Sequence, residues 1–104
     1  MKSLALLLAA VGVLAAGFAY SQSGSEVLKA KGCLNCHEND KKKVGPAYKD
    51  VAAKYANDKD AATRLAKKVR EGGVGVWGQI PMPANPQVNE AESLQLVKWV
   101  LSLK

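Results

Sequence analysis

The chain has 104 residues, which is room for one domain, and it carries 15 lysine and arginine residues against 9 aspartate and glutamate residues. The formal net charge of +6 at pH 7 favours acidic protein surfaces as partners, although solubility alone would explain it equally well. No nucleic-acid-binding motif accompanies the basic residues, so nucleic acid is excluded as the expected partner.

The start of the chain, residues 1–19, has the pattern of a secretory signal peptide. Lys2 gives a short positive beginning, and residues 4–16 form an uncharged run rich in leucine, alanine and valine. Small residues follow, so cleavage is expected after Ala19, with Ser21 as a second position.

An uncleaved membrane anchor is the alternative interpretation of this leader. Residues 4–20 carry no charge, but the stretch is short for a transmembrane helix, which needs about 20 residues. If the leader is removed, residues 20–25 are expected to form a flexible spacer and residues 26–104 the folded domain.

Short helices are expected in four segments: 25–32, 45–57, 60–73 and 89–104. The expected N-caps are Ser25, Asp60 and Asn89. Pro46 stands where the second helix can begin, since proline is favoured in the first helical turn. Asn89 and Glu92 have the spacing of a capping box, so the last helix is the clearest of the four.

Residues 72–88, between the third and fourth of these segments, hold three prolines and four glycines. This composition excludes a helix and argues against a regular strand. The fold class is therefore predicted to be all-α, with about four short helices around a core and one long structured loop. Long loops of this kind in small domains are usually functional.

Residues 33–37, Cys-Leu-Asn-Cys-His, contain both cysteines and the only histidine of the chain. This is the attachment pattern of c-type haem, in which Cys33 and Cys36 form thioethers and His37 binds the iron. Cleavage after Ala19 would leave 85 of the 104 residues, and so small a domain usually needs a staple or a large cofactor.

Three other kinds of site use similar residues. A thioredoxin-like pair would need a strand before the motif and a βαβ context, which are not visible. A structural zinc site needs four ligands, and the chain offers two cysteines and one histidine. A disulfide at this spacing would close only a tiny loop. Haem is the preferred interpretation.

Met82 is the only methionine after Met1, and it lies between Pro81 and Pro83, which stiffen the loop. A thioether on a rigid loop is suited to be the sixth ligand of a His-ligated haem iron. Without the haem motif, a gap-filling or exposed methionine would be the preferred interpretation.

Several residues are candidates for supporting roles. The Pro46 carbonyl is expected near the Nδ1–H of His37 and would fix the ring. Trp77 is either a hydrogen-bond donor to a haem propionate or a core residue, and Trp99 is expected in the core. Other residues expected to line the haem or the core are Leu28, Val44, Tyr48, Tyr55, Leu65 and Ile80. The lysines at 41–43, 49 and 54 form either a docking ring or a solvated face.

With these motifs in place, residues 26–104 resemble the small bacterial class I cytochromes c of the c-551/c-552 type. The resemblance rests on KGCLNCH (31–37), VGPAYKDVAAKY (44–55), GVWGQIPMP (75–83) and KWVLSLK (98–104). It implies an all-α fold wrapped around one covalently bound haem c and its iron.

The resemblance also implies roles for individual residues. His37 and Met82 would be the axial ligands, Pro46 would orient His37, and Trp77 would contact a propionate. Asn85 matches a position whose amide can hydrogen-bond the ligand sulfur.

Two positions depart from the family pattern. Lys68 stands where some relatives place an arginine beside the propionate, which leaves Lys68 and Arg70 as candidates. The segment ANPQVNE (84–90), which contains Asn85, is about one residue longer than in some members.

The expected function is that of a soluble, monomeric periplasmic single-electron carrier, and not of an enzyme, because both axial positions are filled. The resemblance suggests a quinol-oxidising complex as donor and a terminal oxidase or nitrite reductase as acceptor. The alternatives are a haem enzyme or gas sensor with a labile Met82, a thiol-redox or metal-binding module without haem, and the same carrier tethered by its leader.

Overall fold

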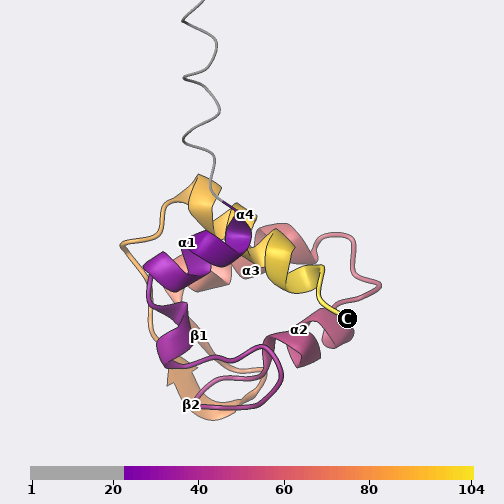
Figure 1. The fold of residues 1–104 in the computed structure, drawn as a ribbon. Helices are drawn as coiled ribbons and strands as arrows, with labels where there is room; N and C mark the ends of the chain where they lie inside the picture. Colours follow the sequence, from indigo (N-terminus) through magenta and orange to yellow (C-terminus); the bar gives the residue numbers. More distant parts are fainter. Residues whose placement is uncertain (1–22) are drawn as a thin grey trace, which may run out of the picture.

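The computed structural model describes residues 23–104, so the expected signal peptide and the first residues of the expected spacer lie outside the described residues. The elements in chain order are α1 (Gly24–Ala30), the 3₁₀ helix η2 (Cys33–Asn35), α2 (Tyr48–Lys54), α3 (Ala61–Glu71), β1 (Gly73–Gly75), β2 (Gly78–Met82) and α4 (Glu90–Leu101) (Figure 1). The prediction of an all-α fold with four short helices is confirmed. Over residues 23–104, no helix combines the length and apolar character needed to cross a membrane.

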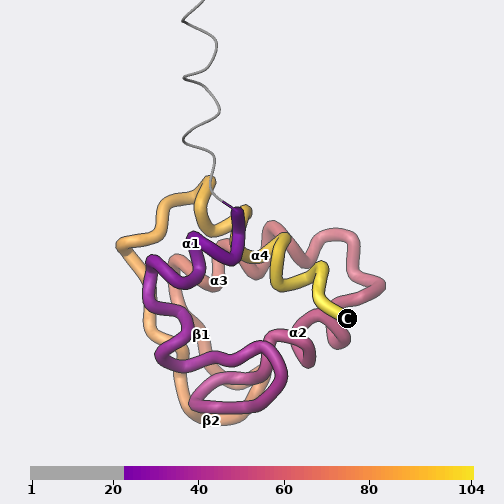
Figure 2. Tube along the Cα trace, viewed as in Figure 1, coloured from indigo at the N-terminus to yellow at the C-terminus, as the bar shows by residue number. Residues whose placement is uncertain are grey.

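Helix α4 is the centre of the fold, because it contacts α1, α2 and α3. The ribbon places α1, α3 and α4 together, and the chain ends close to α2 (Figures 1 and 2). Leu96, Val97 and Val100 lie on the buried side of α4, as expected for apolar residues spaced three and four apart. The remaining residues of the buried cluster are Val27, Leu28, Tyr48, Ala66, Val69 and Val88.

A glycine sets how closely α1 lies against α4. Gly24 is buried, and a Cβ atom at this position would fall 2.4 Å from Cβ of Trp99 and 2.5 Å from the carbonyl oxygen of Gln95. No side chain fits in that space, so the crossing of the two helices requires glycine. The crossing in turn fixes the position of the Cys-x-x-Cys-His segment, which follows α1 directly.

The first helix begins earlier than predicted, because Ser23 and not Ser25 is its N-cap. The Ser23 hydroxyl accepts the backbone N–H of Glu26 at 3.2 Å, and the Glu26 carboxylate accepts that of Ser23 at 3.0 Å. This reciprocal capping box satisfies two backbone donors, and Ser25 has no glutamate three residues later to form one. The predicted spacer 20–25 is therefore wrong at its end, since Gly24 and Ser25 are helical.

The starts of α4 and α3 are placed as predicted, but only α4 has the predicted side-chain cap. The Asn89 side chain accepts the Glu92 N–H at 2.8 Å, and Glu92 returns a bond to the Asn89 N–H at 3.0 Å. Asp60 is at the N-cap position of α3, but its carboxylate makes no capping bond. Asp58 instead accepts the Asp60 N–H at 3.0 Å, which orders the turn before the helix.

The expectation that residues 72–88 contain no regular strand is wrong. Strands β1 and β2 form an antiparallel hairpin in which Gly73 pairs with Met82 and Gly75 pairs with Gly78. The φ angles of Gly75 (107°) and Gly78 (118°) lie where only glycine is comfortable, and they allow the tight reversal. A proline is tolerated in β2 because a two-stranded sheet has only edge strands.

The capping box of α4 makes an acid-dependent prediction. The pKa of Glu92 is lowered, chiefly by the hydrogen bond from the Asn89 N–H and further by Lys31, whose Nζ lies 3.4 Å from the carboxylate. A carboxyl group whose pKa is lower in the folded state stabilises the fold above its unfolded pKa of about 4.3. That contribution is lost as the pH falls through the folded pKa.

We therefore expect Glu92→Gln to lose less stability than the unmodified protein between neutral pH and about pH 3, because glutamine keeps the capping bond without titrating. Urea denaturation at both pH values measures the difference. Glu71→Gln is the control, because within residues 23–104 the Glu71 carboxylate makes no hydrogen bond or ion pair. The same acid sensitivity in Glu92→Gln and in the unmodified protein would contradict the prediction.

Candidate functional site

The Cys-x-x-Cys-His segment folds into one tight turn after α1. Gly32 has a φ angle of 82°, which ends the helix and directs the chain into η2. The Cys33 carbonyl then accepts the backbone N–H groups of Cys36 at 3.2 Å and His37 at 3.1 Å. Both cysteines are half-buried free thiols. Two thiols and an imidazole are thus held together by local hydrogen bonds.

The surroundings of these cysteines do not suit a thiol-redox or zinc site. Burial raises the pKa of the Cys33 thiol, whereas reactive redox cysteines have a lowered pKa. No strand precedes the motif in the described part of the chain. Among residues 23–104, no three or more histidine, cysteine, aspartate and glutamate side chains are grouped so that they could hold a metal ion.

The imidazole of His37 is oriented by a backbone carbonyl, as predicted from Pro46. Nδ1 of His37 lies 2.8 Å from the Pro46 carbonyl oxygen, and the side chain is 9% exposed. A carbonyl oxygen only accepts hydrogen bonds, so Nδ1 carries a hydrogen, and in the neutral ring Nε2 has the lone pair. This is the arrangement in which a histidine binds a metal through Nε2.

The imidazole of His37 also has close neighbours above its ring plane. The Tyr48 ring stacks on His37 with 4.8 Å between centroids and 16° between planes. A Cβ atom on Gly45 would fall 2.5 Å from Cε1 and 2.9 Å from each ring nitrogen of His37. These near-equal distances put the Cβ position of Gly45 over a face of the ring. Tyr48 and Gly45 together restrict the tilt of the ring plane.

The loop that carries Gly45 and leads to Tyr48 is closed by its own backbone hydrogen bonds. The Cys36 carbonyl accepts the N–H groups of Val44 at 3.1 Å and Gly45 at 2.8 Å, and the Tyr48 N–H donates to the Glu38 carbonyl at 2.9 Å. Tyr48 is also the first residue of α2, after an extended Ala47.

Helix α2 thus begins two residues later than Pro46 suggests, because the extended Ala47 lies between them as the N-cap. Tyr48 is buried, and burial, followed by the nearby cysteines, raises the pKa of its hydroxyl. The ring stacked on the imidazole therefore belongs to a neutral side chain.

Met82 is the last residue of β2, and its backbone lies close to Gly72, the C-cap residue of α3. It is half-buried against the helical core, as is Cys33. A Cβ atom on Gly72, whose φ angle is 83°, would fall 2.7 Å from the Met82 carbonyl oxygen and 2.9 Å from the Ala84 nitrogen. Gly72 is therefore required both for its backbone conformation and for the close approach of the 82–84 segment.

Asn85 joins the segment after Met82 to the end of α3. Its backbone N–H donates to the Arg70 carbonyl at 3.2 Å, and its side-chain amide donates to the carbonyls of Val69 at 2.9 Å and Pro83 at 3.2 Å. The last carbonyls of a helix have no partner within the helix, so Asn85 acts as a cap from a distant segment. This role was not predictable from the sequence. The bond from Asn85 to the Met82 sulfur stays a prediction.

The two tryptophans have different environments. Trp77 is 42% exposed at the hairpin turn, so it is not a core residue, and Lys54 Nζ lies 5.7 Å from the centroid of its ring. Trp99 packs partly buried against the helical core, as predicted. The contact of Trp77 with a propionate stays a prediction.

Lys68 and Arg70 point to different neighbours. The aliphatic part of Lys68 runs beside β1, with Cε 3.2 Å from the position of a Cβ atom on Gly73. The Arg70 guanidinium instead faces Glu90 at the start of α4, with 3.8 Å between Nη1 and the carboxylate. Of the two candidates, Lys68 is therefore the one on the hairpin side.

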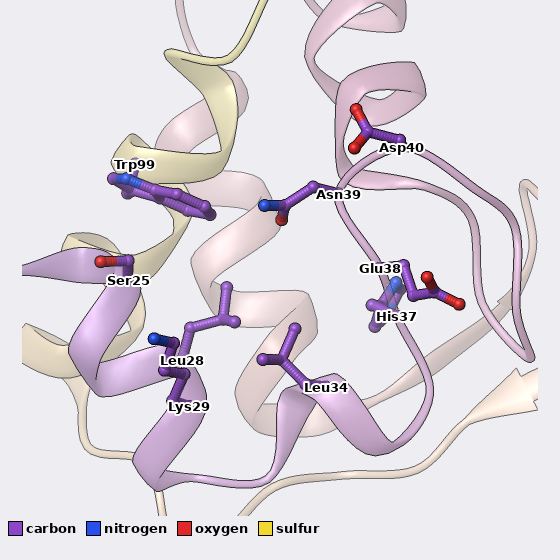
Figure 3. A pocket seen from close by; sticks show the side chains of 9 residues that line it. All are labelled: Ser25, Leu28, Lys29, Leu34, His37, Glu38, Asn39, Asp40 and Trp99. Carbon is purple, nitrogen blue, oxygen red and sulfur yellow. The ribbon is translucent and has the colours of Figure 1, made fainter.

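A cavity of about 540 Å³ lies between α1, α4 and the loop after His37 (Figure 3). Its volume is in the range of small-molecule sites. Leu28 and Leu34 point toward its middle, and the Asn39 amide points toward Trp99. The other lining residues are Ser25, Lys29, His37, Glu38 and Asp40. His37 lines this cavity but Met82 and the cysteines do not, so the cavity belongs to the imidazole side of the site.

Several large apolar side chains lie outside the helical core. They are Leu34, Val44, Val74, Val76, Trp77 and Ile80. Val44 at 48% and Ile80 at 67% exposure are not core residues, because the loop and the hairpin that carry them extend beyond the packed helices. Leu28 and Tyr48 are buried as expected, and Tyr55 and Leu65 are half-buried. Exposed apolar side chains at such a density mark a surface that contacts a ligand or a partner.

Comparisons with known proteins agree on one family. The cytochrome c family model matches residues 21–104. The chain is similar to cytochrome c-551 of Pseudomonas aeruginosa, with 50% identity over all of both chains, and to cytochrome c-552 of Hydrogenobacter thermophilus, with 53% identity over 95% of this chain and 96% of the relative. The crystal structure of Nitrosomonas europaea cytochrome c552 covers 77% of this chain and 99% of its own, with 51% identity and a TM-score of 0.75.

Replacement of Gly72 by alanine tests the contact between α3 and the methionine segment. An unfavourable backbone conformation alone costs about 1 to 3 kcal/mol of stability. We expect the free energy of unfolding of Gly72→Ala to fall by more than this, because the new methyl group would also collide with the Met82 carbonyl. Urea denaturation measures the loss. Gly75→Ala is the matched control, since Gly75 has a φ angle of 107° but nothing within 4 Å of its Cβ position. Equal losses in the two variants would show that the collision does not matter.

Proposed function

The chain belongs to the cytochrome c family, and from this premise we propose that it is a soluble periplasmic single-electron carrier. The family binds one covalently attached haem c with its iron. We therefore propose that the Cys-x-x-Cys-His segment and Met82 bind this haem. The observation that carries the proposal is the imidazole of His37, which directly follows two half-buried thiols and keeps Nε2 available.

The residues present fit such a group. Cys33 and Cys36 would attach it through thioethers, and His37 and Met82 would be the axial ligands. When bound, the haem iron supplies a ferric–ferrous couple, whose potential is raised by methionine ligation. With both His37 and Met82 bound, the iron would have no open position for a substrate, which supports a carrier rather than an enzyme.

The chain's own residues keep the proposed iron ligands in place during electron transfer. Pro46 holds the Nδ1–H of His37, and Gly45 and Tyr48 fix the ring plane. Ligands that do not move when the charge changes keep the energetic cost of electron transfer small. The hairpin position of Lys68 supports a role beside a propionate, together with Trp77.

The proposed partners have acidic surfaces. Lys41, Lys42 and Lys43 are exposed in the loop after His37, and Lys43 Nζ donates to the Leu34 carbonyl at 3.1 Å, which places it beside an exposed apolar residue. Positive charge around an apolar contact surface speeds encounter with an acidic partner without a tight complex. We propose a quinol-oxidising complex as donor and a terminal oxidase or nitrite reductase as acceptor.

Met82→Ala separates a carrier from a haem sensor or haem enzyme. In the unmodified holoprotein, we expect the reduced spectrum to change little under carbon monoxide, because the sulfur holds the sixth position. In Met82→Ala we expect nearly complete carbon monoxide binding and a lower reduction potential. Gln79→Ala, an exposed change in the same hairpin, should behave as the unmodified protein. Ready carbon monoxide binding by the unmodified protein would favour a sensor or an enzyme.

Charge reversal at Lys41 and Lys42 tests the docking surface. With ferricyanide as an anionic electron acceptor, we expect the Lys41→Glu/Lys42→Glu protein to be oxidised roughly three- to tenfold more slowly at low salt, because the attracting field is weakened. The difference should shrink at about 1 M salt, where the Debye length is about 3 Å.

The control for this experiment is Lys67→Glu/Lys98→Glu, which makes the same change of charge on α3 and α4. Stopped-flow absorbance gives the rates of all three proteins. If both double variants are slowed equally, net charge and not a local docking surface controls the encounter.

A further inference from the structure

One side-chain amide joins the two halves of the site. Nε2 of Gln87 donates to the Lys31 carbonyl at 3.2 Å and to the side-chain oxygen of Asn85 at 3.1 Å. A primary amide has two N–H donors, so both bonds form at once. Lys31 and Gln87 are 56 residues apart in the sequence, which makes this a link between the beginning and the end of the domain.

On one side, this link leads to Met82. The Asn85 oxygen that accepts from Gln87 belongs to the amide whose nitrogen donates to the carbonyl of Pro83, the residue next to Met82. The same nitrogen holds the end of α3 through Val69. A displacement of Gln87 is therefore transmitted to the segment that carries the thioether.

On the other side, the link leads to the cysteines. Lys31 is the C-cap of α1, and only Gly32 separates it from Cys33. Lys31 also contacts the start of α4, with its Nζ 3.4 Å from the Glu92 carboxylate. The residue that receives the Gln87 bond is thus held by a second contact, and it provides a fixed point against which the methionine segment is tied.

We infer that Gln87 is a positioning residue, which holds the Met82 segment to the entry of the Cys-x-x-Cys-His turn and thereby slows the release of Met82 from the iron. This rests on the proposed function, in which Met82 is an axial ligand. Gln87 is itself exposed and contacts neither thiol nor the thioether, so its effect is exerted through Asn85 and Lys31.

The experiment measures how fast added imidazole replaces Met82 in the ferric holoprotein, followed by absorbance. We expect exchange in Gln87→Ala to be about two- to tenfold faster, the factor for loss of about one ordinary hydrogen bond. Gln87→Glu should be at least as fast, because a carboxylate has no N–H and would face two oxygen atoms. Gln79→Ala is the matched control, because Gln79 lies in β2 and its side chain makes no hydrogen bond within residues 23–104.

Urea denaturation of the same proteins separates positioning from general stability. Faster exchange in the Gln87 variants, with denaturation midpoints close to that of Gln79→Ala, supports the inference. Unchanged exchange, or exchange accelerated only where the whole fold is weakened, overturns it. If the unmodified holoprotein has no sulfur ligation in its ferric spectrum, the proposed function fails instead, so the two failures are distinguishable.

Discussion

The hydrogen bond between His37 and the Pro46 carbonyl is the interaction on which the site is built. It closes a loop that is already tied by the Cys36 carbonyl, and it leaves a single imidazole nitrogen for coordination. The bond requires that the chain pass directly over the ring, which is possible only because residue 45 is glycine. In the proposed function, this loop would determine where His37 meets the iron relative to α1 and α4, and the rest of the chain would have to bring Met82 to the same group.

The methionine side is built differently. His37 is held by residues within eleven positions of it in the sequence, whereas the Met82 segment depends on Gly72, on the last carbonyls of α3 and on the link from Gln87 to Lys31. Contacts between distant segments are lost when any one of the packed elements opens. With Met82 as the proposed ligand, local unfolding should therefore release its thioether while the imidazole is still held, because segments tied by few contacts open first.

The sequence predicts those parts of the molecule that depend on neighbouring residues. The haem motif, the Asn89–Glu92 capping box and the Pro46–His37 contact all lie within short segments, and the structure contains the last two. The Ser23–Glu26 box is equally local, but the polar, glycine-containing composition of residues 21–25 is also typical of a flexible spacer. The roles of Asn85 and Gln87 were not predictable, because their bonds to α3 and to the end of α1 go to the backbone carbonyls of Val69 and Lys31. Every residue has such a carbonyl, and only the packing of the helices brings these two near. The hairpin was missed for a related reason, since glycine and proline indicate a turn but not the strands it connects.

The apolar residues of the chain divide into two groups with different consequences. One group forms the core between α1, α3 and α4, and the other lies exposed in η2, on the loop after His37 and on the hairpin. An exposed apolar surface favours contact with copies of the same chain as much as with partners. The chain has 15 basic and 9 acidic residues, and this positive net charge acts against self-association because like charges repel. The same charge attracts an acidic surface. The lysines and the exposed apolar residues are therefore complementary: the apolar residues provide the contact, and the charge determines which surfaces can reach it.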